Sequence, residues 1–144
     1  MNEGNSSRRD RVSELVARLR ESSPLDRPGA FLVEAPLRIR PLGAHVDHQG
    51  GVVTGMTVDR RVVMAAVPES DAVIRVTSLD FPAEVEVKLG DQVPTRAGDW
   101  GDYVRAAVAV LAKDHRLRCG FRAVIGGDLP SAGLSSSAAV IVAY

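Results

Sequence analysis

Apolar residues along the chain follow two different periods, which predict helices and strands in separate segments. Residues 8–20 place apolar side chains at i, i+3, i+4 and i+7, the spacing of an amphipathic helix, and residues 99–115 repeat it after an Asp99 cap. Strands are predicted where β-rich runs are bounded by turn residues: 31–39, 52–58, 61–67, 72–78, 84–89 and 121–125. Runs of strands with two helices between them indicate an α+β fold rather than regular βαβ repetition.

The same pattern divides the chain into two parts. Residues 1–29 are expected to form a docking helix and a proline-containing linker, and residues 30–144 one α+β domain. Pro36 interrupts the first strand, so we expect it at a sheet edge or a bulge, because proline cannot donate to a strand ladder. A last helix beginning near Ser135 has no closing Gly, Asn or basic residue. The domain is therefore expected to be incomplete.

Composition adds mainly exclusions. The 144 residues carry 18 Lys and Arg against 18 Asp and Glu, so the chain lacks the basic field typical of non-specific nucleic-acid binding. Cys119 is the one cysteine and is expected to be a buried small side chain beside a strand. No apolar run has the length of a membrane span, and the first residues lack a signal-peptide core. We expect a cytoplasmic protein with small-molecule partners, no nucleic acid and no membrane, of unknown oligomeric state.

A small-residue turn leads directly into an Ala/Val/Ile helix at residues 129–143, and this arrangement is typical of an anion site. Free N–H groups converge there at the positive end of a helix dipole. Gly133 lets the backbone approach a ligand, and Ser135, Ser136 and Ser137 can bond phosphate oxygens or magnesium. From this stretch alone, an ordinary Ser-capped helix is an equally good interpretation.

A second motif lies upstream at residues 35–51 and reads A-P-L-R-I-R-P-L-G-A-H-V-D-H-Q-G-G. Together the two motifs resemble the galactokinase branch of the GHMP kinases, with signatures of approximately G-R-x-N-L-I-G-E-H-x-D-Y and P-x-x-x-G-L-x-S-S-A. The departures resemble the galacturonokinase subgroup, which phosphorylates a sugar acid. The resemblance covers residues 31–144. It implies the GHMP kinase N-terminal domain, a ribosomal-protein-like mixed sheet with helices packed on one side.

The resemblance implies roles for the upstream motif. Arg38 matches the arginine near the catalytic carboxylate and the attacking hydroxyl, and Arg40 replaces the family's Asn. His45 and Asp47 match residues that contact ring hydroxyls, and His48 stands where Tyr is usual. The general base, an Asp in the family, is expected beyond residue 144. Alternatives from the residues alone are solvated arginines, a polar hairpin loop, or a zinc site, which has too few ligands here.

Three small residues of this motif also belong to the predicted sugar-binding site. Gly50 and Gly51 supply a tight turn, which suits a sugar loop or a plain hairpin. Ala44 stands where galactokinases have a Glu that accepts from the C6 hydroxyl. A C6 carboxylate would be repelled by that Glu, so Ala44 favours a sugar acid, with Arg40 and Arg61 as candidate cations for it.

The downstream motif implies ATP and Mg²⁺ as cofactors, with Ser137 as the magnesium ligand. Its loop is one residue shorter than the galactokinase pattern. Trp100 and Tyr103 match a W-x-x-Y near the adenine pocket, although such a pair on a helix stripe is also typical of plain core. The predicted cofactor-binding residues are Pro130, Gly133, Leu134, Ser135, Ser136, Ser137, Ala138, Trp100 and Tyr103.

These interpretations combine into one predicted function with open alternatives. The chain resembles part of an ATP-dependent sugar-1-kinase that converts a hexuronic acid, galacturonate above all, to its 1-phosphate. The alternatives are a galactokinase acting on galactose, a non-catalytic sugar/ATP sensor of galactokinase type, and an RNA-binding α+β domain, which the neutral charge disfavours. Without the general base, this chain alone is expected to be inactive.

Overall fold

The computed structural model describes the chain except residues 1–2, 24–28, 44–46, 91–93 and 129–135, and it describes only the backbone of residues 3–7, 47 and 136. Its elements in chain order are α1 (Glu3–Ser22), β1 (Phe31–Ile39), the 3₁₀ helix η1 (Asp47–Gln49), β2 (Met56–Pro68), β3 (Val73–Ser78), β4 (Glu84–Lys88), α2 (Asp102–Leu111), β5 (Phe121–Gly127) and α3 (Ser136–Ala143).

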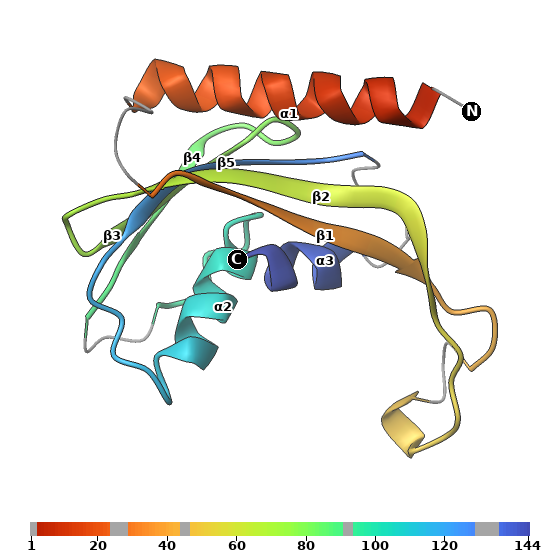
Figure 1. The fold of residues 1–144 in the computed structure, drawn as a ribbon. Helices are drawn as coiled ribbons and strands as arrows, with labels where there is room; N and C mark the ends of the chain where they lie inside the picture. Colours follow the sequence, from red (N-terminus) through yellow and green to blue (C-terminus); the bar gives the residue numbers. More distant parts are fainter. Residues whose placement is uncertain (1–2, 24–28, 44–46, 91–93, 129–135) are drawn as a thin grey trace.

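One five-stranded sheet organises the domain, with strand order β1-β2-β5-β3-β4. Neighbouring strands are antiparallel except β3 and β5, which are parallel, so the sheet is mixed. The α+β fold class is confirmed. In Figure 1, α2 and α3 cover one face of the sheet and α1 lies across the other. Within residues 30–144 the helices thus pack on one side of the sheet, and the N-terminal docking helix lies on the other side.

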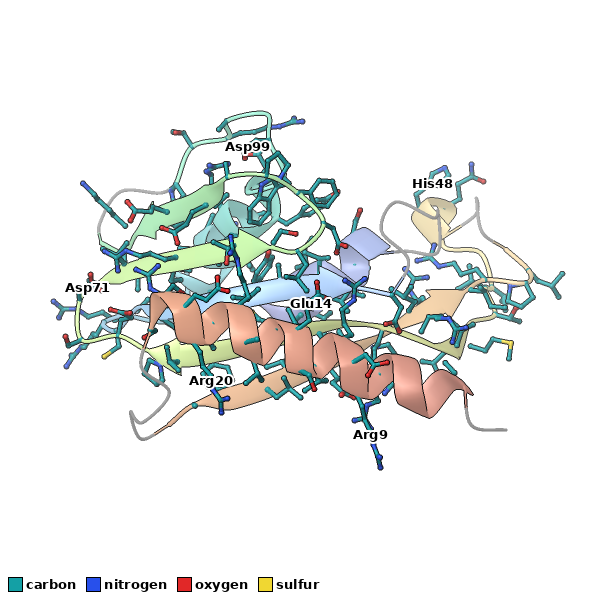
Figure 2. All side chains as sticks on the ribbon, turned by 90° about the horizontal axis from the view of Figure 1, so that it is seen from above. Arg9, Glu14, Arg20, His48, Asp71 and Asp99 are labelled. Carbon is teal, nitrogen blue, oxygen red and sulfur yellow. The ribbon has the colours of Figure 1, made fainter. Side chains whose placement is uncertain are left out.

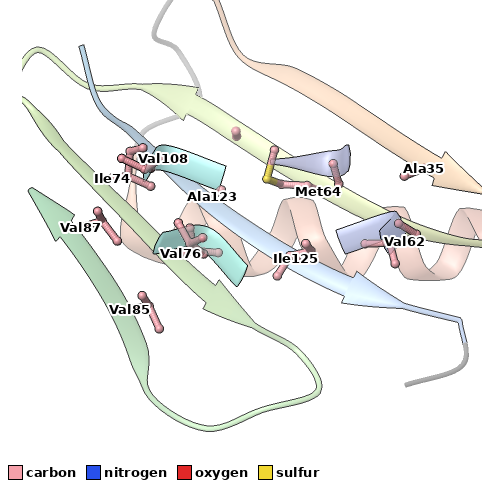
Figure 3. Close-up of a cluster of buried hydrophobic side chains, with 14 of the residues drawn as sticks. Ala35, Val62, Met64, Ile74, Val76, Val85, Val87, Val108, Ala123 and Ile125 are labelled. Carbon is pink, nitrogen blue, oxygen red and sulfur yellow. The ribbon is translucent and has the colours of Figure 1, made fainter. Parts of the chain in front are cut away.

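Two hydrophobic clusters hold these layers together, and β2 contributes to each of them. Its Val62 and Met64 face the larger cluster with α2 and α3 (Figure 3). Its Val63 and Ala65 belong to the cluster with α1. Because side chains of a strand alternate between faces, a strand covered on both sides is apolar at every position. This explains why residues 62–67 are continuously apolar.

Helix α1 packs on the sheet as the docking helix that its periodicity predicts. Leu15 and Leu19 are buried against the α1 face of the sheet. Polar contacts add to this packing: Arg8 forms a bidentate ion pair with Glu34 of β1, and the Arg11 guanidinium donates to the Gly127 carbonyl at 2.5 Å. The helix is therefore part of the same folded unit as the sheet.

Strand β1 confirms the prediction made from Pro36. It is an outer strand of the sheet, and its register against β2 shifts between Pro36 and Arg38. Such a bulge increases local twist and bends a strand. The Pro36 bulge therefore lies immediately before Arg38 and the loop that carries the upstream motif.

Three smaller expectations are wrong. Cys119 is exposed rather than buried. Helix α2 begins at Asp102 and ends at Leu111, so it is shorter than residues 99–115, and Leu111 is exposed although it continues the apolar stripe. The runs 52–58 and 61–67 are not two strands, since one strand begins at Met56 and continues to Pro68.

No helix in the described part of the chain is both long enough and apolar enough to cross a membrane.

Candidate functional site

The upstream motif forms a loop between β1 and β2 whose ends are joined by two hydrogen bonds. The Leu42 N–H donates to the Thr54 hydroxyl at 3.1 Å, and the Thr54 N–H donates to the Leu42 carbonyl at 3.1 Å. Gly43 has a φ of +78°, and a Cβ there would lie 2.6 Å from the carbonyl oxygen of Val52. The loop therefore requires glycine at its neck for two reasons, the backbone conformation and the lack of space.

Gly43→Ala should destabilise the protein more than Gly50→Ala. Gly50 also has a positive φ, +71°, but nothing lies within 4 Å of a Cβ there, so its replacement adds only the left-handed strain of about 1–2 kcal/mol. Gly43→Ala adds a backbone clash, and overpacking of this kind costs a further 1–3 kcal/mol or so. Urea unfolding of both variants measures the difference. Equal free energies of unfolding would contradict the close approach at Gly43.

The two motif arginines lie at the end of β1. Arg38 is the penultimate residue of the strand, pairs with Thr57 and is partly buried; it makes no side-chain hydrogen bond or ion pair with any residue that the structure describes. Arg40 lies one residue beyond the strand and is also partly buried. Because Arg38 is partly buried and bonds none of the described residues, its guanidinium is suited to receive an anionic ligand.

The rest of the motif is described in part. His48 lies exposed in η1 and shares a hydrogen bond of 3.2 Å with Gln49. Gly50 and Gly51 follow it and are exposed. Ala44, His45 and the side chain of Asp47 lie outside the described residues.

Arg61 is already engaged in ion pairs. It bonds Glu34 at 3.0 Å and Asp59 at 2.5 Å, and Glu34 is also the partner of Arg8 from α1. Burial tends to raise the pKa of Glu34, but the hydrogen bonds from Arg8 and Arg61 outweigh it and hold the pKa below its ordinary value. Arg61 therefore belongs to a pairing that ties α1 to the sheet.

Helix α3 carries the start of the downstream motif and lies on the same side of the sheet as the upstream loop. It packs against β1 and β2, and its Ala139 and Ala143 are buried in the larger cluster. In Figure 1 the C-terminus marks the end of α3 nearer α2, so α3 begins at the end directed toward η1. Residues Pro130, Gly133, Leu134 and Ser135 and the side chain of Ser136 lie outside the described residues.

Tyr103 joins α2 to the first turn of α3. Its hydroxyl shares a hydrogen bond of 2.8 Å with the Ser137 hydroxyl, and Ala138 follows in the same helix. A bonded Ser hydroxyl has a fixed direction, and it can still offer a lone pair to a cation when it donates its proton to the tyrosine oxygen. Tyr103 thus orients the Ser137 hydroxyl, which stays a predicted magnesium ligand, through a contact that the W-x-x-Y spacing did not predict.

Tyr103→Phe should therefore lower kcat of the full-length kinase with a smaller change in KM for the sugar. The loss of one neutral hydrogen bond is worth about 0.5–1.5 kcal/mol, or roughly 2- to 10-fold. Steady-state kinetics at several magnesium concentrations test this, because a loosened ligand should raise the magnesium requirement. Phe31→Leu, at the exposed first residue of β1 and at the opposite end of that strand from the upstream loop, is the control that should leave the magnesium requirement unchanged.

The end of β5, directly before the downstream motif, is held by contacts distant in sequence. The Gly127 N–H donates to the Asp80 carboxylate at 2.8 Å, and the Arg61 N–H donates to the Asp128 carboxylate at 2.9 Å. The Asp128 N–H in turn donates to the Arg61 carbonyl at 3.0 Å. These carboxylates fix where the motif begins, and no local pattern in the sequence identifies them, because each partner lies in another strand or its flanking turn.

Trp100 lies just before α2 and packs on the connection between β3 and β4. Its indole N–H donates to the Pro82 carbonyl at 2.9 Å, and its ring stacks on Phe81 with centroids 6.4 Å apart and planes at 19°. The interpretation of Trp100 as a packing residue is thus supported by direct contacts, while the adenine contact stays a prediction.

Asp102 organises the approach to α2. Its carboxylate accepts from the backbone N–H groups of Ala97 and Gly98 at 2.8 and 2.9 Å, and it also bonds Arg105 and Arg96. The Ala97 hydrogen bond contributes most, and together these bonds outweigh burial and lower the pKa of Asp102 from 3.8 to about 2.

Because the folded pKa of Asp102 lies below the unfolded one, its contribution to stability is present above pH 4 and is lost as the pH falls toward 2. Asp102→Asn should lower Tm at pH 6, and its curve of Tm against pH should converge with that of the wild type toward pH 2. A difference in Tm independent of pH would show that the carboxylate charge contributes nothing.

No group of three or more His, Cys, Asp or Glu side chains is placed to hold a metal ion within the residues that the structure describes. His45 and the Asp47 side chain are outside that set, so the zinc alternative gains no support. The described side chains around the two motifs are instead arginines, hydroxyls and an exposed imidazole, which suit sugar hydroxyls and phosphate oxygens.

Comparisons with known proteins agree with these motifs. Residues 23–68 match the family model described as the galactokinase galactose-binding signature. The fold matches the crystal structure of Lactococcus lactis galactokinase complexed with galactose, with a TM-score of 0.80 and 28% identity over 91% of this chain and 34% of that one. The chain is thus similar to the galactokinase branch of the GHMP kinases in its motifs and its fold. The matched structure is a galactokinase solved in complex with galactose.

The curated proteins to which the chain is similar include both a galacturonokinase and galactokinases. The galacturonokinase of Arabidopsis thaliana is 38% identical over 152 aligned positions, which cover 92% of this chain and 35% of the relative. The galactokinase of Chloroflexus aggregans is 39% identical over 119 positions, covering 81% of this chain and 30% of the relative. The chain thus spans about a third of the length of the curated galactokinase-type relatives that it matches.

Proposed function

We propose that the protein is an ATP-dependent sugar-1-kinase whose substrate is a hexuronic acid, D-galacturonate above all, and that this chain supplies its sugar loop and phosphate loop. His45 and Asp47 orient the sugar hydroxyls, and His48 lies at the exposed tip of the same loop. Arg38 offsets the charge that develops when the anomeric hydroxyl attacks the γ-phosphoryl group. The residues from Gly133 to Ser137 hold the β- and γ-phosphates with magnesium, and the general base comes from beyond residue 144.

The observation that supports this proposal is the position of α3, the described part of the downstream motif, relative to the loop between β1 and β2. The sugar loop leaves β1, and α3 packs on β1 and β2 with its first turn directed toward that loop (Figure 1). In phosphoryl transfer the acceptor hydroxyl and the phosphate must be held in line, and positioning with charge neutralisation supplies most of the rate. A helix start pointing away from the loop would have removed the basis for the proposal.

A sugar acid is favoured over galactose by two residues and one comparison. Ala44 removes the carboxylate that would repel a C6 acid, and Arg40, at the loop entrance, is a cation in place of the family's Asn. A galacturonokinase is among the relatives with 38% identity. A galactokinase acting on galactose is the alternative, supported by the family model that matches residues 23–68.

Phosphorylation by the full-length protein should be measured with galacturonate and galactose side by side, following ADP release and the sugar 1-phosphate. The proposal expects a higher kcat/KM for galacturonate. A preference for galactose would support the sugar-kinase activity but contradict the proposed hexuronic acid substrate. Tight binding of sugar and ATP without ADP release would indicate the sensor instead.

A further inference from the structure

A hollow separate from the two motifs lies between the end of β4, the end of α2 and the segment that leads to β5. It has a volume of about 1080 Å³, which slightly exceeds the roughly 300–1,000 Å³ typical of small-molecule sites. Its lining includes Leu89, Val108, Ala112 and Leu117, of which Val108 is buried and Leu89 and Leu117 pack against the larger cluster. The floor of the hollow is therefore apolar.

The rim of the hollow is positively charged. Among the described lining residues, one carboxylate, Asp114, stands against the cationic or imidazole side chains of Lys88, Lys113, His115, Arg116 and Arg118. None of these basic side chains makes a hydrogen bond or an ion pair with a residue that the structure describes. In a chain with equal numbers of acidic and basic residues, this is a local excess of positive charge.

Arginines elsewhere in the protein show the contrast. Arg75 bonds Asp71 and Glu86, and Arg122 bonds Glu69 and Glu84. Each of these arginines thus has two carboxylate partners supplied by the fold. The basic side chains around the hollow have no such carboxylate partner among the described residues, so they can bind an anionic ligand.

The end of a helix accounts for part of this pattern. Cations are favoured at the negative end of a helix dipole, and Lys113 and His115 follow the last turn of α2. Lys88 is the last residue of β4, and Arg118 lies close to the start of β5, so the dipole of α2 does not explain them. Like charges held together repel one another, and a bound anion relieves that repulsion.

We propose that this hollow binds a small organic phosphate, with its apolar body on the Leu89–Leu117 floor and its phosphate among the rim cations. The hollow is distant from the candidate kinase site. Lys88 pairs with Val73 at the end of the sheet marked by Asp71, and His48 lies at the opposite end in Figure 2. Tyr103, which contacts the phosphate-loop helix, is in the first turn of α2, and the hollow is at the last turn. A ligand there is a second ligand of the protein.

The test uses the full-length protein and 1-naphthyl phosphate, an aromatic phosphate dianion, in calorimetric titrations. The double variant Arg116→Ala/Arg118→Ala should weaken its binding at least about tenfold. Arg9→Ala/Arg20→Ala is the matched control, because it removes the same charge from exposed α1 positions (Figure 2) and should change binding less than about twofold. Excess ATP should not displace the probe, and inorganic phosphate should bind at least about tenfold more weakly.

Several results would overturn the proposal. No binding of the probe, or equal losses in the two double variants, would show that the hollow does not collect anions. Displacement by ATP would assign the probe to the nucleotide site. Equal affinity for inorganic phosphate would show that the apolar floor takes no part. Circular dichroism of each variant should match the wild type, and a misfolded double variant is replaced by Lys88→Gln/Lys113→Gln, for which the same losses are expected.

Discussion

Arg38→Ala is expected to lower kcat of the full-length kinase about 10²- to 10³-fold, with a smaller change in KM, since removing one donor that stabilises transition-state charge has an effect of this size. Arg38 is held at the end of β1 after the Pro36 bulge, partly buried, and it bonds no residue that the structure describes. Its removal breaks no ion pair among the described residues, so we expect the loss to be catalytic rather than structural.

Two further variants make the Arg38 test specific. Arg38→Lys keeps the charge but loses the planar fork, so it should recover only part of the rate. Arg60→Ala removes an exposed arginine of β2 whose printed contact is the carbonyl of the neighbouring Asp59, and it should leave kcat within about twofold. A rise in KM with unchanged kcat for Arg38→Ala would mean that Arg38 binds the substrate and does not act on the transition state.

Ala44→Glu is expected to reduce kcat/KM for galacturonate about 100-fold or more. A carboxylate about 4 Å from the C6 acid is repelled by about 4 kcal/mol at an effective dielectric constant near 20, and 1.4 kcal/mol is a factor of ten. The same change should improve the use of galactose, because the new carboxylate can accept from the C6 hydroxyl.

Ala44→Gln separates charge from volume in that experiment. Gln has nearly the size of Glu but no charge, so it should reduce the use of galacturonate far less than Glu does. Equal losses with Gln and Glu would indicate a steric effect, and an unchanged ratio of galacturonate to galactose in Ala44→Glu would place the specificity in other residues.

Local sequence pattern predicted those parts of the fold that are determined by residues close together in the sequence. Strand β1 has the predicted bounds of residues 31–39, and the Pro36 edge bulge is present, because proline acts through its own missing N–H. The prediction divided strand β2 at the polar pair Asp59 and Arg60, which breaks the apolar run in sequence. These two residues lie where the register against β1 shifts, and pairing with β1 is present on either side of them, at Thr57 and at Arg61, so the strand continues through them.

Contacts distant in sequence were beyond the reach of periodicity. The strand order β1-β2-β5-β3-β4 inserts the fifth strand between the second and third, and no local signal specifies this. The carboxylates of Asp80 and Asp128 that hold the end of β5, and the Tyr103–Ser137 hydrogen bond, depend on that order. The motif residues were identifiable because their chemistry lies in short runs, whereas the residues that position them are spread over the whole chain.

Trp100, stacked on Phe81, gives the chain an intrinsic fluorescent probe. The chain contains one tryptophan, and its indole lies where the β3–β4 connection meets the segment before α2. Tryptophan fluorescence from this chain, excited selectively over its two tyrosines, therefore originates at a single junction, and a shift in its wavelength reports separation of that junction without any attached dye. Since α2 also carries Tyr103 in its first turn, the same signal senses motion next to the helix that follows the phosphate loop.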